Sequence, residues 1–302
     1  MGDESDESDV RARAECDSIV QRCEAGELSP PVALMQMLIA AEDDALVASV
    51  VRERSAASPR ATEIARLLEA HAPGCARITA MLKSGMDSPS PHASVEDGVA
   101  FSRRLFDWSV QQSEEASVAL YSLGDPALLE AATREIVSLF DTWDLLGGRR
   151  AALDIGCGIG RLEVALAPQL GTIHGIDVSE EMIAAARRRC AALPNVTLSV
   201  GSGFDLADVA DGAIDFVFAV DSFPYLVQSG MPLVDAHFDE ARRVLAAGGD
   251  FVVLNFSYRA DAARDRDEVV SLAAAHGFDV RVLGTSPFAL WDGVAFRLVK
   301  RA

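Results

Sequence analysis

The chain has 302 residues, of which 50% are hydrophobic and 24% are charged, a composition typical of a globular protein with one large domain and a smaller appendage. Acidic residues outnumber basic ones by 46 to 27, and a net charge of -19 repels nucleic-acid backbones, so we expect no nucleic-acid partner. The sequence has no apolar run of about 18 residues, so we expect neither a membrane-spanning helix nor a membrane partner. Residues 1–10 carry five carboxylates and no Lys or Arg, whereas a secretory signal begins with basic residues. This difference predicts a cytoplasmic location.

The N-terminal third differs in composition from the rest of the chain. We expect residues 1–9 to form an acidic disordered tail. Residues 10–83 are rich in Ala, Leu, Glu and Arg, with apolar residues at helical spacing, and predict a helical region that either caps a pocket or forms a homodimer. The stretch SGMDSPSP cannot continue a helix, so we expect a linker at residues 84–94 and a separate domain over residues 95–302.

Beyond the linker, apolar runs alternate with amphipathic segments. Helices are predicted at 95–110, 126–146, 161–170, 180–193, 231–247 and 261–276. Strands are predicted at 151–155, 172–178, 196–200, 214–220, 251–256, 278–283 and 295–300. This alternation predicts an α/β fold with a doubly wound, parallel sheet that helices cover on both faces.

A glycine loop, Gly156-Cys157-Gly158-Ile159-Gly160, follows Asp154 at the end of the first predicted strand. Glycines at alternate positions allow a sharp turn and a close approach of the backbone to a ligand. A dinucleotide-binding loop has the spacing G-x-G-x-x-G, whereas here Arg161 replaces the last glycine, and a carboxylate at Asp154 favours a cationic ligand over a pyrophosphate. At the end of the second strand, Asp177 can accept both hydroxyls of a ribose. Together these residues predict a site for a nucleoside with a positively charged tail.

At this point the sequence, from about residue 100 to its end, resembles the class I S-adenosylmethionine-dependent methyltransferases of small-molecule type. The resemblance rests on the segments LDIGCGIGR (153–161), GIDVSEEMI (175–183), SVGSGFDL (199–206), IDFVFAVDSFPYL (214–226) and EARRVLAAGGDFVVLNF (240–256). It implies a Rossmann-like sheet of seven strands, mostly parallel with an antiparallel last strand, and S-adenosylmethionine as the cofactor.

The resemblance also implies roles for individual residues. Asp154, Gly156 and Gly158 would line the methionine moiety, and Asp154 would act on its ammonium through a water or a backbone amide. Asp177 would hold the ribose, and Met182 would pack on adenine. Near the adenine position, the acidic residue usual in the family is replaced by Ser202 or displaced to Asp205. The full set of implied cofactor-binding residues is Tyr121, Asp154, Gly156, Cys157, Gly158, Gly160, Arg161, Asp177, Val178, Met182, Ser202, Gly203, Phe204, Val220 and Asp221.

Three of these assignments have an alternative. Met182 is either an adenine contact or ordinary helix core. Asp221 either orients a substrate amine or hydroxyl, or caps the turn that follows it. Tyr121 belongs either to a lid over the cofactor or to a plain turn between two helices.

Methyl transfer is an in-line displacement that depends mainly on aligning the reactants and excluding water, so a protein base is optional and no catalytic residue is assigned. Among the histidines, His276 is read as a helix C-cap, His174 as a residue on a strand face and His237 as a solvated helix position. The five scattered cysteines show neither metal-ligand spacing nor a disulfide pattern and predict reduced, mostly buried thiols.

The sequence therefore predicts an enzyme that transfers a methyl group from S-adenosylmethionine to an oxygen or nitrogen atom of a small molecule. The helices before Leu146 and the loop at 222–232 are expected to select the acceptor. The alternatives are a regulatory protein that binds S-adenosylmethionine without turnover, and an oxidoreductase that uses a nicotinamide cofactor.

Overall fold

The computed structural model describes residues 3–84 and 92–302, with side chains from Asp9 onward. The described chain divides into two compact units. The first contains residues 3–84, Ser109–Ala132 and Phe288–Asp292, and the second contains residues 92–108, Thr133–Pro287 and Gly293–Ala302. The boundary crosses helices α6 (Val95–Gln112) and α8 (Pro126–Thr142), so the chain passes between the units several times. Most of the predicted linker at 84–94 lies outside the described residues.

The first unit is helical. Its other elements are α1 (Asp3–Glu24), α2 (Pro30–Ala41), α3 (Asp44–Ser55), α4 (Pro59–Ala70), α5 (Ala72–Lys83), α7 (Glu114–Val118) and the 3-10 turn η1 (Leu120–Ser122). Ser and Pro set two of the helix starts, because Ser29 and Ser58 accept amide hydrogen bonds from the first turns of α2 and α4 and a proline follows each of them. Helix α1 begins at Asp3, within the segment for which a disordered tail is expected.

A short segment from the C-terminal half of the chain belongs to this helical unit. The hydroxyl of Ser29 donates to the carbonyl of Leu290, at 2.7 Å. The amide of Gln36 donates to a carboxylate oxygen of Asp292. The rings of Tyr121 and Trp291 stack with their centroids 6.0 Å apart, and both side chains are buried. Segments far apart in the sequence therefore share one core.

The second unit is built on a seven-stranded sheet, which lies wholly within residues 147–300, all of them described. Its strands are β1 (Gly147–Ile155), β2 (Leu170–Asp177), β3 (Val196–Val200), β4 (Ile214–Val220), β5 (Leu245–Leu254), β6 (Phe278–Thr285) and β7 (Ala295–Lys300). Its remaining helices are α9 (Arg161–Leu166), η2 (Ala167–Gln169), α10 (Glu180–Arg189), α11 (Phe223–Ser229), α12 (Met231–Val244) and α13 (Ala262–Ala275).

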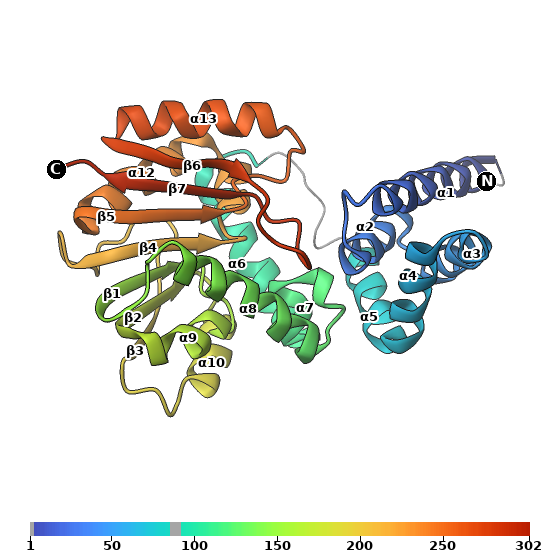
Figure 1. Cartoon of the computed structure of the whole chain (residues 1–302), viewed down its shortest axis with the longest axis horizontal. Coiled ribbons are helices and arrows are strands. Elements are labelled where there is room, and N and C mark those ends of the chain that lie inside the picture. Colours follow the sequence, from blue (N-terminus) through green and yellow to red (C-terminus); the bar gives the residue numbers. More distant parts are fainter. Residues whose placement is uncertain (1–2, 85–91) are drawn as a thin grey trace. The chain divides into compact units, whose positions relative to one another are not determined.

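The strand order is β3-β2-β1-β4-β5-β7-β6, with β7 antiparallel to both of its neighbours (Figure 1). Helices α9 and α10 pack beside β2 and β3, while α12 and α13 pack beside β5 and β6. The predicted α/β fold with a mostly parallel, doubly wound sheet is therefore confirmed. The order of the strands reverses at β1 and β4, and in such sheets ligands bind at that point, outside the carboxyl ends of the strands.

The core explains why the central strands are apolar throughout. On β4, Phe216 and Phe218 contact the ring of Phe140 from α8, with centroids 5.0 and 5.4 Å away. Val217, between them, belongs to the buried cluster that also holds Phe251 of β5. Burial on both faces removes the alternation of polar and apolar residues, as expected for a central parallel strand.

Several predicted boundaries differ from the structure, two of them in the segment after β4. Helix α11 occupies most of the segment that the sequence predicts to be a loop at 222–232. Helix α12 ends at Val244 rather than at residue 247, because Leu245 pairs with Ile214 and begins β5. Here strand pairing overrides the helical propensity of the two alanines that follow.

Among the described residues, none of the helices has both the length and the apolar character needed to cross a bilayer. All five cysteines lie in the described part of the chain, where each is buried and free.

Candidate cofactor site

The glycine loop joins β1 to α9 and packs closely against the ends of β2 and β4. Gly156 and Gly160 have φ angles of 82° and 76°, a left-handed conformation that favours glycine. A Cβ atom on Gly156 would lie 2.4 Å from the Cβ atom of Ser222, at the end of β4. The amide of Gly156 donates to the carbonyl of Ile176 at 2.8 Å, and the amide of Cys157 donates to the same oxygen at 3.1 Å. These contacts fix the loop at the carboxyl ends of β1, β2 and β4.

The carboxylate of Asp177, the last residue of β2, is held by backbone amides. Its two oxygens accept hydrogen bonds from the amides of Gly158 and Ser179, each at 2.9 Å. Burial raises the pKa of Asp177 to about 6, although the amide hydrogen bonds act in the opposite direction. The side chain thus links the glycine loop to the start of α10, and each oxygen keeps a lone pair for a further donor.

The carboxyl group of Asp154, the penultimate residue of β1, lies beside that of Glu163 on α9. Asp154 is 1% exposed and Glu163 is 0% exposed. None of their four oxygens has a hydrogen-bond donor as partner within the described part of the chain. Burial raises the pKa of Glu163 to about 7, and burial together with Glu163 raises the pKa of Asp154 well above its usual range. Glu163 was not among the predicted site residues, although its position on the buried face of a helix, one turn before Leu166, is the signal that identifies it.

Helix α6 holds the segment that follows β2. The guanidinium of Arg103 donates to the carbonyl of Val178 at 3.1 Å. Asp107 accepts a hydrogen bond from the hydroxyl of Ser179 at 2.6 Å, and the same hydroxyl accepts from the amide of Met182 and caps α10. Met182 is buried, as both readings of this residue require.

The predicted adenine segment forms a turn that its own side chains stabilise. The hydroxyl of Ser202 donates to Asp205 at 3.1 Å and accepts from the amide of Phe204 at 3.0 Å. Gly203 has a φ angle of 84°, and a Cβ atom there would lie 2.7 Å from Val99 of α6. Phe204 is 37% exposed, which leaves its ring open to solvent at this edge of the unit.

At the end of β4, Val220 is buried and Asp221 turns the chain with a φ angle of 57°. One carboxylate oxygen of Asp221 accepts hydrogen bonds from the amide of Asn255 at 2.7 Å and from the hydroxyl of Tyr258 at 3.0 Å. Tyr225 packs edge-on against Tyr258, with centroids 6.0 Å apart. The observed partners of Asp221 therefore come from the segment after β5.

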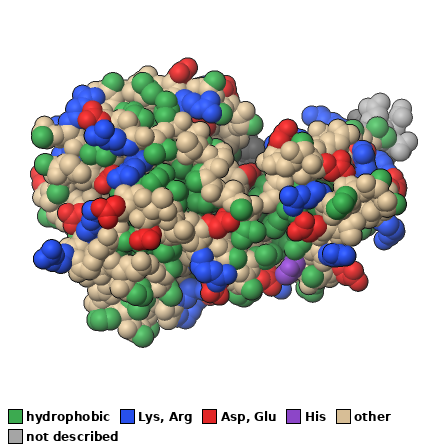
Figure 2. All heavy atoms as spheres, in the orientation of Figure 1, with side chains coloured by type: hydrophobic (Ala, Val, Ile, Leu, Met, Phe, Trp, Pro, Cys, Tyr) green, Lys and Arg blue, Asp and Glu red, His purple; other side chains and the backbone are tan. Residues whose placement is uncertain are grey.

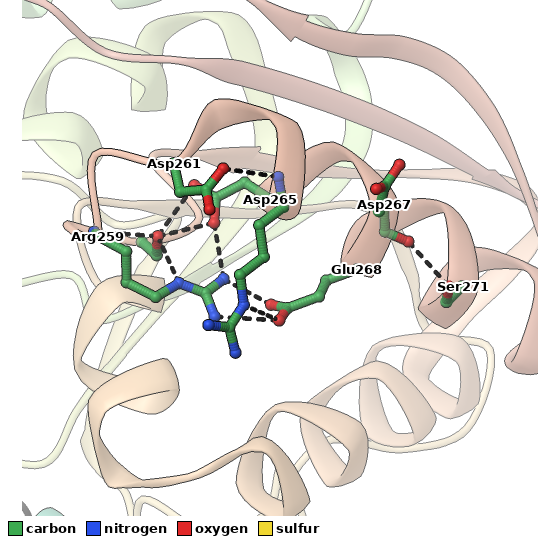
Figure 3. Close-up of polar contacts among 8 residues, drawn as sticks. Arg259, Asp261, Asp265, Asp267, Glu268 and Ser271 are labelled. Carbon is green, nitrogen blue, oxygen red and sulfur yellow. Dashed lines mark hydrogen bonds and ion pairs between the residues drawn. The ribbon is translucent and has the colours of Figure 1, made fainter.

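An ion-pair network anchors that segment (Figure 3). Arg259 donates to Asp265 at 2.7 Å and to Glu268 on α13 at 3.0 Å. The hydroxyl of Ser257 donates to Asp265 at 2.8 Å, and Arg264 donates to Glu268 at 2.8 Å. The network fixes the backbone on both sides of Tyr258.

Two predicted site residues have partners elsewhere. Tyr121 belongs to the first unit, where it packs on Trp291. The guanidinium of Arg161 donates to the hydroxyl of Thr133 on α8, at 3.1 Å.

The histidines have structural partners. His237 is buried against the carbonyl of Leu233, so the expectation of a solvated position is wrong. His276 does end α13, and its ring contacts the carboxylates of Asp235 and Asp239.

The comparisons with known proteins agree with this architecture. A family model described as "Methyltransferase domain" matches residues 152–249, which include the glycine loop and both strand-end carboxylates. Demethylmenaquinone methyltransferase of Symbiobacterium thermophilum is 30% identical over 181 residues, which are 57% of this chain and 64% of that protein. An uncharacterized 37.1 kDa protein in transposon TN4556 of Streptomyces fradiae is 35% identical over 131 residues, which are 42% of this chain and 36% of that protein. The chain thus spans less than two thirds of the length of these relatives.

The chain contains a methyltransferase domain. The methyltransferase family predicted from the sequence is confirmed, and S-adenosylmethionine remains the predicted cofactor. Phosphoethanolamine N-methyltransferase 1 of Haemonchus contortus, solved with phosphoethanolamine and S-adenosylhomocysteine, shares the fold with a TM-score of 0.57 and 20% identity over 69% of this chain and 50% of that chain.

The residues of the methyltransferase domain fit this cofactor. Asp154 offers buried carboxyl oxygens that have no donor within the described part of the chain, and their negative charge suits an ammonium ligand. Asp177 has acceptor capacity left for ribose hydroxyls at the end of the neighbouring strand. When bound, the cofactor would supply an electrophilic methyl group on a sulfonium.

Proposed function

We propose that this protein is an enzyme that transfers the methyl group of S-adenosylmethionine to an oxygen or nitrogen atom of a small-molecule acceptor. The observation that carries the proposal is the pairing of two different strand-end carboxylates at the glycine loop. Asp177 is held by two amides, whereas Asp154 has no donor in the described part of the protein. This arrangement suits a ligand with ribose hydroxyls at one end and an ammonium at the other.

The residues of the chain would act by binding and orientation. Asp154 and Asp177 would hold the cofactor, which would supply the methyl group, and the acceptor atom would take up this group as the thioether is released. The acceptor then loses a proton to water or to a nearby carboxylate. Alignment of the two reactants supplies most of the acceleration that this step needs.

The segments at the ends of β4 and β5 support a small acceptor. Tyr225 packs edge-on against Phe106 of α6, with centroids 4.8 Å apart, and against Tyr258. Asp221, bonded to Tyr258, would orient an acceptor hydroxyl or amine. Among the described residues on the face drawn in Figure 2, Lys and Arg alternate with Asp and Glu and form no single basic patch, which favours a small molecule over a nucleic acid.

The remaining expectations stay predictions: a cytoplasmic location, a role of residues 10–83 in dimerisation or capping, and the cofactor contacts inferred from the family resemblance.

The test is binding followed by turnover. We expect S-adenosylhomocysteine to bind the full chain in titration calorimetry. Asp154→Ala should weaken this binding by about 1.5 to 3 kcal/mol, the range for a hydrogen bond to a charged group. Asp267→Ala, which alters an exposed carboxylate of α13, is the matched control and should bind as the original chain does. A panel of phenols and amines with labelled S-adenosylmethionine then tests turnover. Binding without transfer to any acceptor would support a regulatory protein instead.

A further inference from the structure

The buried carboxyl of Glu163 is the feature of the site that the family resemblance does not explain. It comes from α9, while Asp154 comes from β1, so the fold brings together two acids nine residues apart in sequence. The two residues are buried, and the carboxyl oxygens of each have no donor group as partner in the described part of the protein. Buried acids without donors are costly, so their retention requires a compensating interaction.

A glycine makes room for this carboxyl. Gly175 of β2 is the strand partner of Asp154. A Cβ atom on Gly175 would lie 2.6 Å from a carboxyl oxygen of Glu163 and 2.9 Å from the Cβ atom of Cys157. The carboxyl group of Glu163 therefore packs against the backbone of β2 at Gly175, beside Asp154 and close to Cys157 of the glycine loop.

The local charges allow the pair to hold one proton. Two carboxylates cannot both ionise in a buried space of this size without a large cost, and their proton equilibria belong to the pair rather than to either acid. Burial is the main cause that raises both pKa values, that of Glu163 to about 7. The other charged or titratable groups that act on the pair are Arg161 of α9, Asp177 of β2, Cys157 of the loop and Cys190, which follows α10. Arg161 is the cation among them, and its guanidinium donates to Thr133.

We propose that Glu163 is a positioning residue that shares a proton with Asp154 in the free protein, and that binding of the ligand's ammonium group releases this proton. The inference rests on the proposed function, since it requires an adenosyl ligand with an ammonium end. On binding, the ammonium charge at the glycine loop favours the ionised form of the buried pair, and the shared O–H bond breaks. The proton passes to the buffer, and the pair becomes a doubly charged partner for the cation.

The experiment compares two probes by titration calorimetry between about pH 6 and about pH 8. S-adenosylhomocysteine carries the ammonium group, whereas 5′-methylthioadenosine keeps adenine and ribose but lacks the amino-acid end. We expect the affinity for S-adenosylhomocysteine to rise by about tenfold across this range, because a fall of about one unit in a pKa on binding corresponds to that change. Buffers with different ionisation enthalpies should show proton release with S-adenosylhomocysteine and much less with 5′-methylthioadenosine, which reports any contribution of Asp177.

Glu163→Gln keeps the size and a hydrogen-bonding group but removes the titration. In this variant the pH dependence and the proton release with S-adenosylhomocysteine should disappear, while binding of 5′-methylthioadenosine should be unchanged and so show an intact adenosyl site. A matched control is Glu181→Gln on α10, which neutralises an exposed acid and should leave proton release as it was.

The outcomes separate the two proposals. If neither probe binds the original chain, the proposed function fails. If both bind but S-adenosylhomocysteine releases no more protons than 5′-methylthioadenosine, the role of the acid pair is overturned while the adenosyl site stands. Proton release that persists in a folded Glu163→Gln variant overturns the assignment to Glu163. Because the original chain alone gives the first two results, a variant that fails to fold does not remove the test.

Discussion

Asp154 and Asp177 stand at the ends of neighbouring parallel strands, and both are buried, but the protein treats them differently. Asp177 is bonded to two backbone amides that the fold supplies. Asp154 faces a second acid, Glu163, and has no donor in the described part of the chain. One carboxylate is therefore part of the scaffold that shapes the loop, whereas the other would acquire a partner with the proposed ligand. An unpaired buried polar group is costly in a low-dielectric interior, so Asp154 would gain from a cationic partner.

The largest effect should follow removal of the scaffold carboxylate. Asp177→Ala leaves the amides of Gly158 and Ser179 without an acceptor and removes the group that would meet the ribose. We expect binding of both S-adenosylhomocysteine and 5′-methylthioadenosine to weaken by about 2 to 3 kcal/mol, measured by calorimetry. A loss confined to S-adenosylhomocysteine would contradict the distinction between the two acids, since only Asp154 should discriminate between these probes. Asp267→Ala again serves as the control.

An intermediate effect should appear in the stability of the free protein. The pKa of Glu163 is raised to about 7 by burial, so the folded state binds a proton more tightly than the unfolded state does. Its stability therefore falls as pH rises from the unfolded pKa through about 7. Compared with the original chain, Glu163→Gln should be about as stable near pH 4 but more stable by about 2 kcal/mol near pH 8.

Thermal or denaturant unfolding at both pH values checks this prediction, with Glu181→Gln as the exposed control. If the original chain and Glu163→Gln are equally stable near pH 8, ionisation of the buried acid pair does not destabilise the free protein.

The smallest effect should come from Ser179, which lies between Asp177 and the first residue of α10. Ser179→Ala removes the N-cap of α10 and the hydrogen bond to Asp107, and should lower the unfolding free energy by about 1 kcal/mol. Ser58→Ala, which removes the N-cap of α4, is a matched comparison. If Ser179→Ala lowers the unfolding free energy no more than Ser58→Ala does, the hydrogen bond from Ser179 to Asp107 of α6 adds nothing to stability.

Sequence patterns predicted the framework because local signals determine it. The observed bounds of β3, β4 and β7 are those predicted, since turn residues or charged residues flank each apolar run. The strand-end carboxylates and the glycine loop are likewise recognisable from spacing alone, and the structure places them at the same end of the sheet.

The features that the sequence analysis missed depend on contacts between distant segments. Glu163 lies beside Asp154 because Gly175, on the next strand, leaves room for its carboxyl group. His237 is buried because it lies on the same face of α12 as Val234 and Phe238, and this face packs into the core. Asp221 contacts Asn255 and Tyr258 from beyond β5, a pairing that no local pattern announces.

The composition of the helical unit limits how the protein can be dissected. Trp291, which arrives between the last two strands, stacks on Tyr121, and Leu290 accepts the hydroxyl of Ser29. A single cut after residue 84 would remove Ser29 and the helices around it, yet leave Trp291 and Tyr121 on the other fragment with apolar surface that those helices normally share. Truncations meant to isolate the α/β half would thus expose an aggregation-prone face, so deletion variants should also replace the 288–292 segment with a short polar turn.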